Sequence, residues 1–352
     1  MPAIACAFSV DDLEVPPGYS ISVYAHQVEN ARQLALSGDG LLFAGSRDAG
    51  LVHAIIDEDG DYVADRVIKV ATDLRMPSGV AVRDDHLYVA EVHQVTRYAI
   101  AAADGSRLGQ GVVVVDDLPG ETHHGWKFIA FSPDGRLHVP VGAPCNVCAP
   151  PEPFATILRF NANFETRDVV ARGVRNSVGF DWHPDSGELW FSDNGRDWLG
   201  DDLPPGEINR VARDGDHFGF PYRHGGGITD PEFSSVPKDL TPVPPQIELG
   251  AHVAPLGIEF YRGSMFPAEP GRVLFVAEHG SWNRSRKAGY RVMRAVISDN
   301  GRIVRYEPFV TGWLKGAAHW GRPVDFEVLT DGSLLISDDY SNRIFRVVYE
   351  GG

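Results

Sequence analysis

The fold of this chain is decided by a short stretch that recurs along it, and one copy reads FIAFSPDGRLHV over residues 128–139. Apolar residues flank the central Pro133-Asp134-Gly135 on both sides. An Asp-Gly pair between two apolar runs is a strong signal for a β-hairpin, because the turn needs backbone angles that glycine adopts freely. The stretch therefore predicts two antiparallel strands joined by a tight turn.

The repeating unit continues through a loop into a third strand that ends near an arginine. Its six copies begin at Leu34, Gly79, Phe128, Val178, Leu256 and Val324. Repeats of several short strands are typical of propeller blades, and closing a ring removes the exposed strand edges of an open sheet. A β-sandwich would not explain a sixfold repeat. We therefore predict an all-β fold, a six-bladed β-propeller.

The two ends of the chain complete this prediction. The last copy stops at Tyr349 after three strands, whereas residues 19–25 (YSISVYA) form an unassigned strand near the N-terminus. We expect this N-terminal strand to pair with the last blade and close the ring. Residues 1–352 are thus predicted to form a single propeller domain, with residues 1–16 as an N-terminal tail.

Composition and charge exclude some classes of partner. The 352 residues carry a formal net charge of −16, which argues against nucleic acid or an anionic membrane as the main partner. No run approaches the ~18 apolar residues needed for a membrane span. Met1–Phe8 has neither the basic nor the apolar region of a signal peptide. A globular protein without a membrane span is expected.

Two of the three cysteines, Cys145 and Cys148, form a C-x-x-C motif. A zinc site would need a second pair of ligands, and covalent haem would need a histidine where Ala149 stands. A thioredoxin-like centre would need a βαβ context. A local disulfide is the best interpretation, and it favours an oxidising compartment.

Long loops interrupt the repeats of blades three, four and five. They cover residues 144–153, 194–207 and 279–287, and residues 220–250 form a long excursion that we expect to lie between blades. In a propeller such loops gather on one face around the central channel, and long loops on a rigid scaffold often carry function. The functional site is therefore expected at one end of the ring.

Basic residues recur where the chain enters the first strand of a blade. His124 precedes blade three, Arg175 precedes blade four and Arg322 precedes blade six, while Arg47 follows a strand of blade one. The simpler explanation is that this histidine is solvated and these arginines form surface salt bridges. That explanation becomes weaker with each blade that has a basic residue at the same position. Converging arginines suit a ligand rich in carboxylates, which they hold by bidentate contacts.

The loops that follow the second strands of blades four and five are also polar. Residues 192–197 read SDNGRD, and their oxygens could bind Ca²⁺, although the spacing is not that of an EF-hand. Residues 278–284 read EHGSWNR, a mixture of aromatic and polar side chains that suits a sugar or cofactor pocket. A structured turn is the alternative for each loop.

These motifs together resemble those of the soluble PQQ-dependent sugar dehydrogenases, which include glucose/aldose, sorbosone and fungal pyranose enzymes. The resemblance extends from Pro17 to Tyr349. It is strongest to the sorbosone and pyranose dehydrogenase-like branch, through residues 143–148 (APCNVC), 279–284 (HGSWNR) and 321–325 (GRPVD). The order of the motifs on six blades makes the resemblance specific.

The resemblance implies a role for each motif. His124 matches the catalytic base, and the loop with Gly195 and Arg196 matches the one whose backbone carbonyls hold the catalytic Ca²⁺. His123 and Trp320 stand where the glucose enzymes have an acidic residue and an arginine, so glucose itself is not implied as the substrate. The residues implied to bind PQQ are Arg47, Arg175, Asn176, His279, Asn283 and Arg322.

The expected function is a PQQ- and Ca²⁺-dependent oxidoreductase that oxidises a sugar, with His124 accepting the hydroxyl proton. A separate electron acceptor (a quinone, a cytochrome or a dye) would take the electrons, because the chain has no haem motif. The family and the C-x-x-C imply a periplasmic or secreted protein. One alternative is a Ca²⁺-dependent lactonase of the gluconolactonase type, which needs acidic and amide side chains in the channel; a non-catalytic binding propeller is another.

Overall fold

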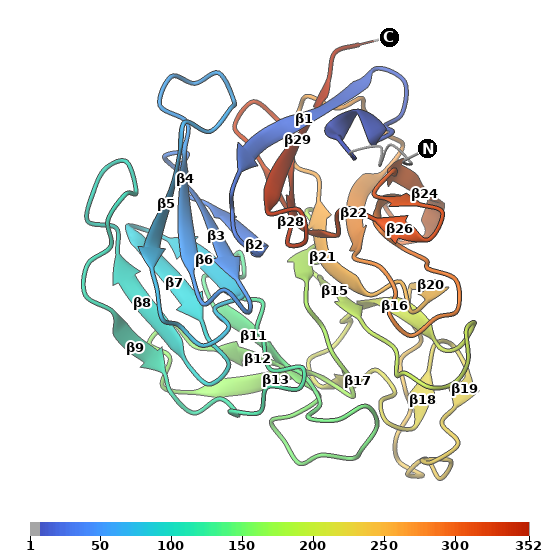
Figure 1. The fold of residues 1–352 in the computed structure, drawn as a ribbon. Coiled ribbons are helices and arrows are strands. Elements are labelled where there is room, and N and C mark those ends of the chain that lie inside the picture. The colour runs from blue at the N-terminus through green and yellow to red at the C-terminus, as the bar shows by residue number, and fades with distance from the viewer. Residues whose placement is uncertain (1–7, 352) are drawn as a thin grey trace, which may run out of the picture.

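The computed structural model describes residues 8–351, so residues 1–7 of the predicted tail and residue 352 lie outside the described residues. Six sheets are arranged in a ring around a central channel (Figure 1). Among the described residues the only helix is the 3-10 turn η1 (Val10–Asp12), and no helix there could cross a membrane. The predicted six-bladed β-propeller is confirmed.

In blades one to three, the strands follow one another outward from the channel in the order of the sequence. Blade one consists of β2 (Ala31–Leu36), β3 (Leu42–Ser46), β4 (Val52–Ile56) and β5 (Arg66–Ala71). Blade two consists of β6 (Gly79–Arg83), β7 (His86–Ala90), β8 (Val95–Ala99) and β9 (Val112–Val115). Blade three consists of β10 (Ala130–Phe131), β11 (Leu137–Val141), β12 (Thr156–Phe160), β13 (Arg167–Arg172) and the parallel edge strand β17 (Asp216–His217).

Blades four and five follow the same plan, and blade six borrows its outer strand from the N-terminus. Blade four consists of β14 (Phe180–Trp182), β15 (Leu189–Asp193), β16 (Pro205–Arg210) and β20 (Ile247–Ala251). Blade five consists of β21 (Pro255–Phe260), β22 (Arg272–Glu278), β23 (Arg291–Ile297) and β24 (Ile303–Val310). Blade six consists of β27 (Pro323–Val328), β28 (Leu334–Asp338), β29 (Arg343–Tyr349) and β1 (Tyr19–His26).

The ring is closed by the N-terminal strand, as the sequence predicts. β1 pairs antiparallel with β29, in a register that places Tyr19 opposite Tyr349 and His26 opposite Arg343. The two strands lie side by side although they come from opposite ends of the chain (Figure 1). The Tyr19 and Tyr349 rings meet edge to face at 4.9 Å. First and last segments therefore share one blade, which ties the termini together.

The hairpin turns have the expected backbone. Gly135 and Gly332, in the Asp-Gly turns of blades three and six, have φ of 79° and 88°. An L side chain rarely adopts these angles. At Gly332 a Cβ would also come within 2.8 Å of the Met265 backbone nitrogen. The repeated glycine thus fixes the register of the first and second strands of these blades.

The hydrophobic core is divided among the six interfaces between neighbouring blades. One cluster, for example, joins Tyr88 and Ala90 of blade two to Ile129 and Leu137 of blade three. Corresponding clusters fill the other five interfaces, including that between blades six and one. At roughly 25 cal/mol per Å² of buried apolar surface, this packing holds the blades in fixed orientations. The loops at the channel are consequently displayed on a rigid frame.

The excursion over residues 220–250 differs from the sequence expectation. It lies within blade four, between the third strand β16 and the outer strand β20, rather than between blades. It forms the small hairpin β18 (Arg223–His224) and β19 (Ile228–Thr229). The outer strand of this blade is thus supplied only after a long detour, which conceals it from a repeat search. A second hairpin, β25 (Leu314–Lys315) and β26 (Ala318–His319), precedes β27.

Candidate functional site

Seven of the nine predicted site residues lie in the wall of one cavity at the end of the channel. The cavity has a volume of about 230 Å³. Four of these residues lie in the loops that enter the first strands β10, β14 and β27, and the other three lie in loops that follow the second strands β3, β15 and β22. The seven are Arg47, His124, Arg175, Asn176, Gly195, His279 and Arg322.

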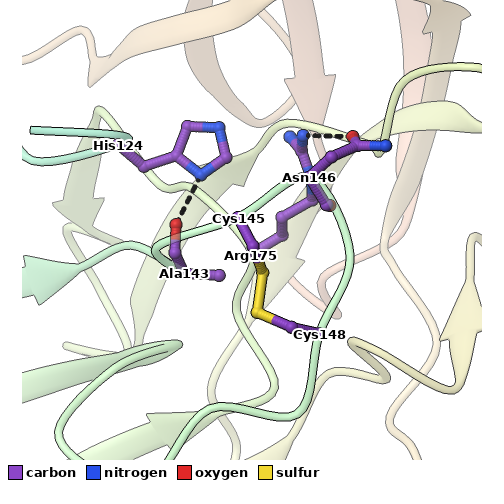
Figure 2. Close-up of a disulfide and its surroundings, with 6 residues drawn as sticks. All are labelled: His124, Ala143, Cys145, Asn146, Cys148 and Arg175. Atoms are coloured by element: carbon purple, nitrogen blue, oxygen red, sulfur yellow. Dashed lines mark hydrogen bonds between the residues drawn. A yellow bond between two sulfur atoms is a disulfide. The ribbon is translucent and has the colours of Figure 1, made fainter.

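His124 is held in one orientation by the neighbouring backbone. Its Nδ1 lies 2.8 Å from the carbonyl oxygen of Ala143 (Figure 2), so Nδ1 carries the proton and Nε2 keeps its lone pair. The backbone of His124 has φ of 52°. Gly142 lies against it, since a Cβ there would come within 2.6 Å of the His124 Cβ. The fixed ring therefore presents Nε2 as a hydrogen-bond acceptor.

Electrostatics keep His124 uncharged. Its pKa lies well below the usual value of 6.5, chiefly because the ring is buried and further because Arg175 and His123 stand nearby. The carbonyl of Ala143 opposes this shift but does not cancel it. A neutral imidazole with a free Nε2 can accept a proton from a hydroxyl group.

The Arg175-Asn176 turn is fixed by a buried carboxylate. Asp193, at the end of β15, accepts hydrogen bonds from the backbone N–H groups of Arg175 (2.9 Å) and Asn176 (2.7 Å). Asn194 donates to the carbonyl of Asn176 at 3.0 Å and to that of Pro255 at 2.9 Å. Burial lowers the pKa of Arg175 to about 10, so the guanidinium remains charged at neutral pH. The turn thus places a buried cation at the cavity.

The C-x-x-C loop contacts this cation directly. Cys145 and Cys148 form a disulfide with their Cα atoms 6.2 Å apart. Asn146, between them, accepts from Arg175 Nε through its carbonyl (2.8 Å) and from Arg175 Nη2 through Oδ1 (2.9 Å; Figure 2). The same Oδ1 accepts from the backbone N–H of Asp197 at 2.8 Å. The disulfide loop therefore joins two parts of the cavity wall.

His279 belongs to a second buried group of charges. Its Nε2 lies 2.9 Å from Asp339 Oδ1, and Arg32 Nη1 lies 2.8 Å from Asp339 Oδ2. Burial lowers the pKa of His279 to about 4, against the attraction of Asp339. The pKa of Asp339 lies below its usual range because His279 and Arg32 contact the carboxylate, and their effect outweighs that of burial, which alone would raise this pKa. Neutral His279, anionic Asp339 and cationic Arg32 thus form one compensated group.

Arg322 and Arg47 differ in how their charge is balanced. Arg322 donates to the carbonyl oxygens of His279 (3.2 Å) and Gly280 (2.6 Å), and it forms no ion pair within residues 8–351. Arg47 lies over the Trp126 ring at 4.6 Å and pairs with the exposed Asp48 at 3.1 Å. Arg322 therefore brings uncompensated positive charge into the cavity wall.

The two remaining predicted residues, Arg196 and Asn283, do not contribute to the cavity wall. Arg196 is buried and points to Asp230 (2.7 Å) and Glu232 (2.8 Å), which leaves only its main chain for a metal. Asn283 donates to Asp197 Oδ1 at 3.4 Å, so it contacts the wall from behind. Both residues stabilise the loops around the cavity instead of forming its surface.

Several wall residues were missed by the sequence analysis, notably Arg32, Asp197 and Trp282. Arg32 is the one basic residue of the buried strand β2, a signal that composition alone would have revealed. Its partner Asp339 directly follows the second strand of blade six, the position that Arg47 occupies in blade one. Comparing equivalent positions of all six copies would have found it. Asp197 belongs to the SDNGRD loop that the sequence indicated as a possible Ca²⁺ site, but it was not itself named as a site residue.

Carboxylates lie at the opposite ends of the inner strands, away from the histidines and arginines at the blade entries. Asp181, Glu259, Asp325 and Glu327 line a second cavity there. Burial raises the pKa of Asp325 to about 7 and that of Glu327 to about 8, with Asp325 adding to the latter shift. Arg262 Nη1 lies 2.8 Å from Asp181 Oδ2 and partly balances this group. The acidic end is thus separate from the His124 cavity.

One further acidic group lies outside the channel, in the loop between β4 and β5. Carboxylate oxygens of Asp57, Asp59 and Asp61 lie within 4.8 Å of one another, the only such grouping of potential metal ligands in residues 8–351. Asp57 accepts from the backbone N–H groups of Gly60 (2.9 Å) and Tyr62 (2.9 Å). These bonds to the loop's own backbone account for the close approach.

Solved structures with the same fold come from fungi and bacteria. The pyranose dehydrogenase PQQ domain of Coprinopsis cinerea, in its holo form, has a TM-score of 0.79 at 18% identity over 96% of this chain and 97% of that one. A calcium structure of carbohydrate-active enzyme family AA12 from Trichoderma reesei gives 0.82 at 18%, over 96% and 97%. The PQQ-bound aldose sugar dehydrogenase of Streptomyces coelicolor gives 0.68 at 19%, over 95% and 99%. These likenesses show the fold.

Sequence comparisons identify the family. An uncharacterized protein of Borreliella burgdorferi is 37% identical over 361 residues, which cover 99% of this chain and 93% of that protein. The family model described as TrAA12-like matches residues 13–207 and 238–312, which include every predicted site residue except Arg322. The chain belongs to the TrAA12-like family.

Proposed function

We propose that the protein is a PQQ- and Ca²⁺-dependent oxidoreductase that oxidises a sugar, an aldose, a pyranose or a sorbosone-like compound. The names of the structural neighbours support this proposal, since they include a pyranose dehydrogenase PQQ domain and an aldose sugar dehydrogenase with bound PQQ. Fold alone does not fix activity, so the case depends on the chemistry of the cavity.

The observation that carries the proposal is the convergence of four arginines in one cavity wall of a chain whose net charge is −16. Arg322 has no carboxylate partner within the described residues, and the buried Nε of Arg32 has no hydrogen-bond partner. His124 and His279 are neutral at pH 7, so they add no charge. PQQ has three carboxylates, which arginines bind by charge-assisted hydrogen bonds. Arg32, Arg47, Arg175 and Arg322 would hold it.

Ca²⁺ would be held by oxygen donors of the loop after β15. Gly195 and Asp197 both belong to the cavity wall, and Ca²⁺ prefers backbone carbonyl and carboxylate ligands. Arg196 would contribute only its carbonyl, because its guanidinium is engaged by Asp230 and Glu232. This donor set suits Ca²⁺ better than zinc, which takes nitrogen and sulfur ligands in most sites.

The residues of the chain assist the reaction in two ways. Bound PQQ would supply a hydride acceptor, and bound Ca²⁺ would supply a Lewis acid beside it. His124 Nε2 accepts the proton of the sugar hydroxyl while the C–H bond at the same sugar carbon breaks. The hydrogen bond to Ala143 keeps the imidazole ring aligned for this transfer. Arg175 and Arg322 stabilise the negative charge that develops in the cavity. Electrons then pass to a separate acceptor, a quinone, a cytochrome or a dye.

Reconstitution tests the proposal. Purified protein is titrated with PQQ in the presence of CaCl₂, and dye reduction is measured with a panel of aldoses, pyranoses and sorbosone. We expect PQQ to bind with a change in its absorbance, and dye reduction to require PQQ, Ca²⁺ and a sugar together. Lack of PQQ binding and of turnover with every sugar would refute the proposal. The disulfide supports a periplasmic or secreted location, which cell fractionation would check.

A further inference from the structure

Two exposed tryptophans stand together at the mouth of the His124 cavity. Trp198 and Trp282 are 67% and 66% exposed, whereas the other five tryptophans of the chain are buried or half-buried. Their ring centroids are 5.5 Å apart and their planes meet at 82°. Trp282 forms part of the cavity wall, and Trp198 lies outside it. The pair therefore extends the cavity outward with a continuous apolar surface.

The tryptophan pair is held in its exposed position by bonds between two loops. Arg284, two residues after Trp282, donates to the carbonyl of Asp201 (2.6 Å) and to Asp202 Oδ1 (3.0 Å). The backbone N–H of Ser285 donates to Asp201 Oδ1 at 3.0 Å. These bonds join the loop after β22 to the loop after β15, so the surface is preorganised rather than collapsed onto the protein.

The backbone at Trp198 is also unusual. It has φ of 70°, a conformation that bulky side chains rarely adopt. Such strain is retained where the surrounding structure imposes it, commonly at ligand sites. Here it accompanies an exposed indole whose one aromatic neighbour among the described residues is Trp282. Exposed, paired and rigid aromatic residues beside a cavity indicate a binding surface.

The chemistry around the pair favours a carbohydrate. Asp197 is a partly exposed residue of the cavity wall, and Asp202 is exposed although Arg284 binds one of its oxygens, so hydrogen-bond acceptors flank the apolar rings. A sugar ring offers a flat face of C–H groups to an aromatic ring and hydroxyl donors at its edge.

We propose that Trp198 and Trp282 bind a second sugar ring, so that the substrate is an oligosaccharide or a glycoside of at least two rings. This inference rests on the proposed sugar oxidation, with the reacting ring placed at His124. Because Trp282 belongs to the cavity wall and Trp198 does not, a saccharide extending from His124 meets Trp282 first and Trp198 next. Affinity then increases with the number of rings.

Saccharide binding without PQQ tests this proposal separately from the activity. The full-length protein is titrated by calorimetry with glucose, xylose, cellotetraose, maltotetraose and xylotetraose. We expect one tetrasaccharide to bind at least about tenfold more tightly than its monosaccharide, and Trp198→Ala and Trp282→Ala each to remove about that factor. Trp198→Phe and Trp282→Phe should restore most of the affinity, because a ring is retained.

Val304→Ala, which removes an exposed apolar side chain from β24, is the control and should bind like the parent. Equal affinity for tetrasaccharides and monosaccharides would overturn the proposal, as would unchanged binding by both alanine variants. A third outcome would also overturn the proposal: the alanine variants bind saccharides normally but reduce a protein acceptor more slowly. That result would mean that the tryptophan pair binds the protein acceptor. Failure of the PQQ reconstitution leaves these titrations interpretable, since they contain no cofactor.

Discussion

His124 Nδ1 lies 2.8 Å from the carbonyl oxygen of Ala143, two residues before the disulfide loop begins at Cys145. This single bond decides which nitrogen of the ring carries the proton, and it leaves Nε2 as the base. The bond also links the loop before β10 to the loop after β11. The chemistry proposed for the cavity therefore depends on a backbone contact within blade three.

Replacing His124 tests the base directly. His124→Ala should reduce kcat of the reconstituted enzyme by roughly 10²–10⁴-fold, the usual contribution of general base catalysis, while PQQ still binds. Dye reduction measures kcat, and absorbance titration measures PQQ binding. His123→Ala is the matched control, because that ring neighbours His124 at 4.2 Å but has no equivalent bond to Ala143. Comparable turnover in the two variants would refute the assignment.

The pH dependence of the reaction follows from the same residue. A base must be deprotonated, and the pKa of His124 is lowered well below 6.5 by burial and by the nearby Arg175. The acidic limb of the kcat/KM profile should therefore lie below pH 6.5, and activity should be constant from there to neutral pH. Arg175→Met removes one cause of the shift and should move this limb to higher pH. An acidic limb above pH 6.5 in the parent enzyme would contradict this prediction.

Arg322 should contribute more to cofactor binding than Arg47. Arg322→Ala is expected to weaken PQQ binding by about 10–100-fold, since hydrogen bonds to charged groups are worth about 1.5–3 kcal/mol. Arg47 already pairs with Asp48, so Arg47→Ala should weaken PQQ binding less. Titration of both variants with PQQ at a fixed Ca²⁺ concentration makes the comparison. Equal affinities for the parent and Arg322→Ala would remove Arg322 from the site.

The fold could be predicted almost completely because its signals are local. Gly135 needs a positive φ, and the same requirement recurs in other copies, so the hairpins are visible in the sequence. The pairing of residues 19–25 with the last blade followed from counting strands, whereas the register of that pairing did not. Residues 220–250 were misplaced because β20 has no turn glycine and follows a long detour.

The site could be predicted only where residues occupy equivalent positions in the blades. Arg175 and Arg322 met that condition, and both reached the cavity. Which way a side chain points within a loop is decided by partners distant in sequence. Arg196 turns away because Asp230 attracts it, and Arg32 is drawn inward by Asp339, 307 residues along the chain. Although Arg32 stands out as the one basic residue of its strand, the partner of each arginine cannot be read from the residues around it.

The disulfide should stabilise both the fold and the cavity. A bridge over so short a loop is worth about 2 kcal/mol in the chain-entropy model, so Cys145→Ser/Cys148→Ser should lower the free energy of unfolding by about that amount. Because Asn146 bonds to Arg175 and Asp197, turnover of the reconstituted variant should fall as well. Denaturant unfolding and dye reduction check the two effects, with Cys6→Ser as control. Unaltered turnover in the double variant would show that the loop holds its shape without the bond.

Asn146→Ala separates the two effects of this loop. It keeps the disulfide and removes the Oδ1 that accepts from Arg175 Nη2 and from the N–H of Asp197. We expect stability to change little and PQQ affinity to fall by about tenfold, as a buried arginine loses a hydrogen bond. The titration used for Arg322 measures this. Full affinity in this variant would mean that the remaining bonds of Arg175, including the one to the Asn146 carbonyl, are enough to position it.

The acidic end of the channel should make stability depend on pH. The folded-state pKa values of Asp325 and Glu327, about 7 and about 8, lie above their unfolded values because of burial. Folding therefore takes up protons, so their contribution is fully present below about pH 4 and is lost as pH rises through 7 and 8. We compare the free energy of unfolding of Glu327→Gln with that of the parent protein at two pH values. The difference should be about 1–3 kcal/mol more in favour of the variant at pH 9 than at pH 5. Glu165→Gln, at an exposed position, is the control and should show no such difference. If the free energy of unfolding depended on pH in the same way for Glu327→Gln and the parent protein, the Glu327 carboxylate would be exposed to water.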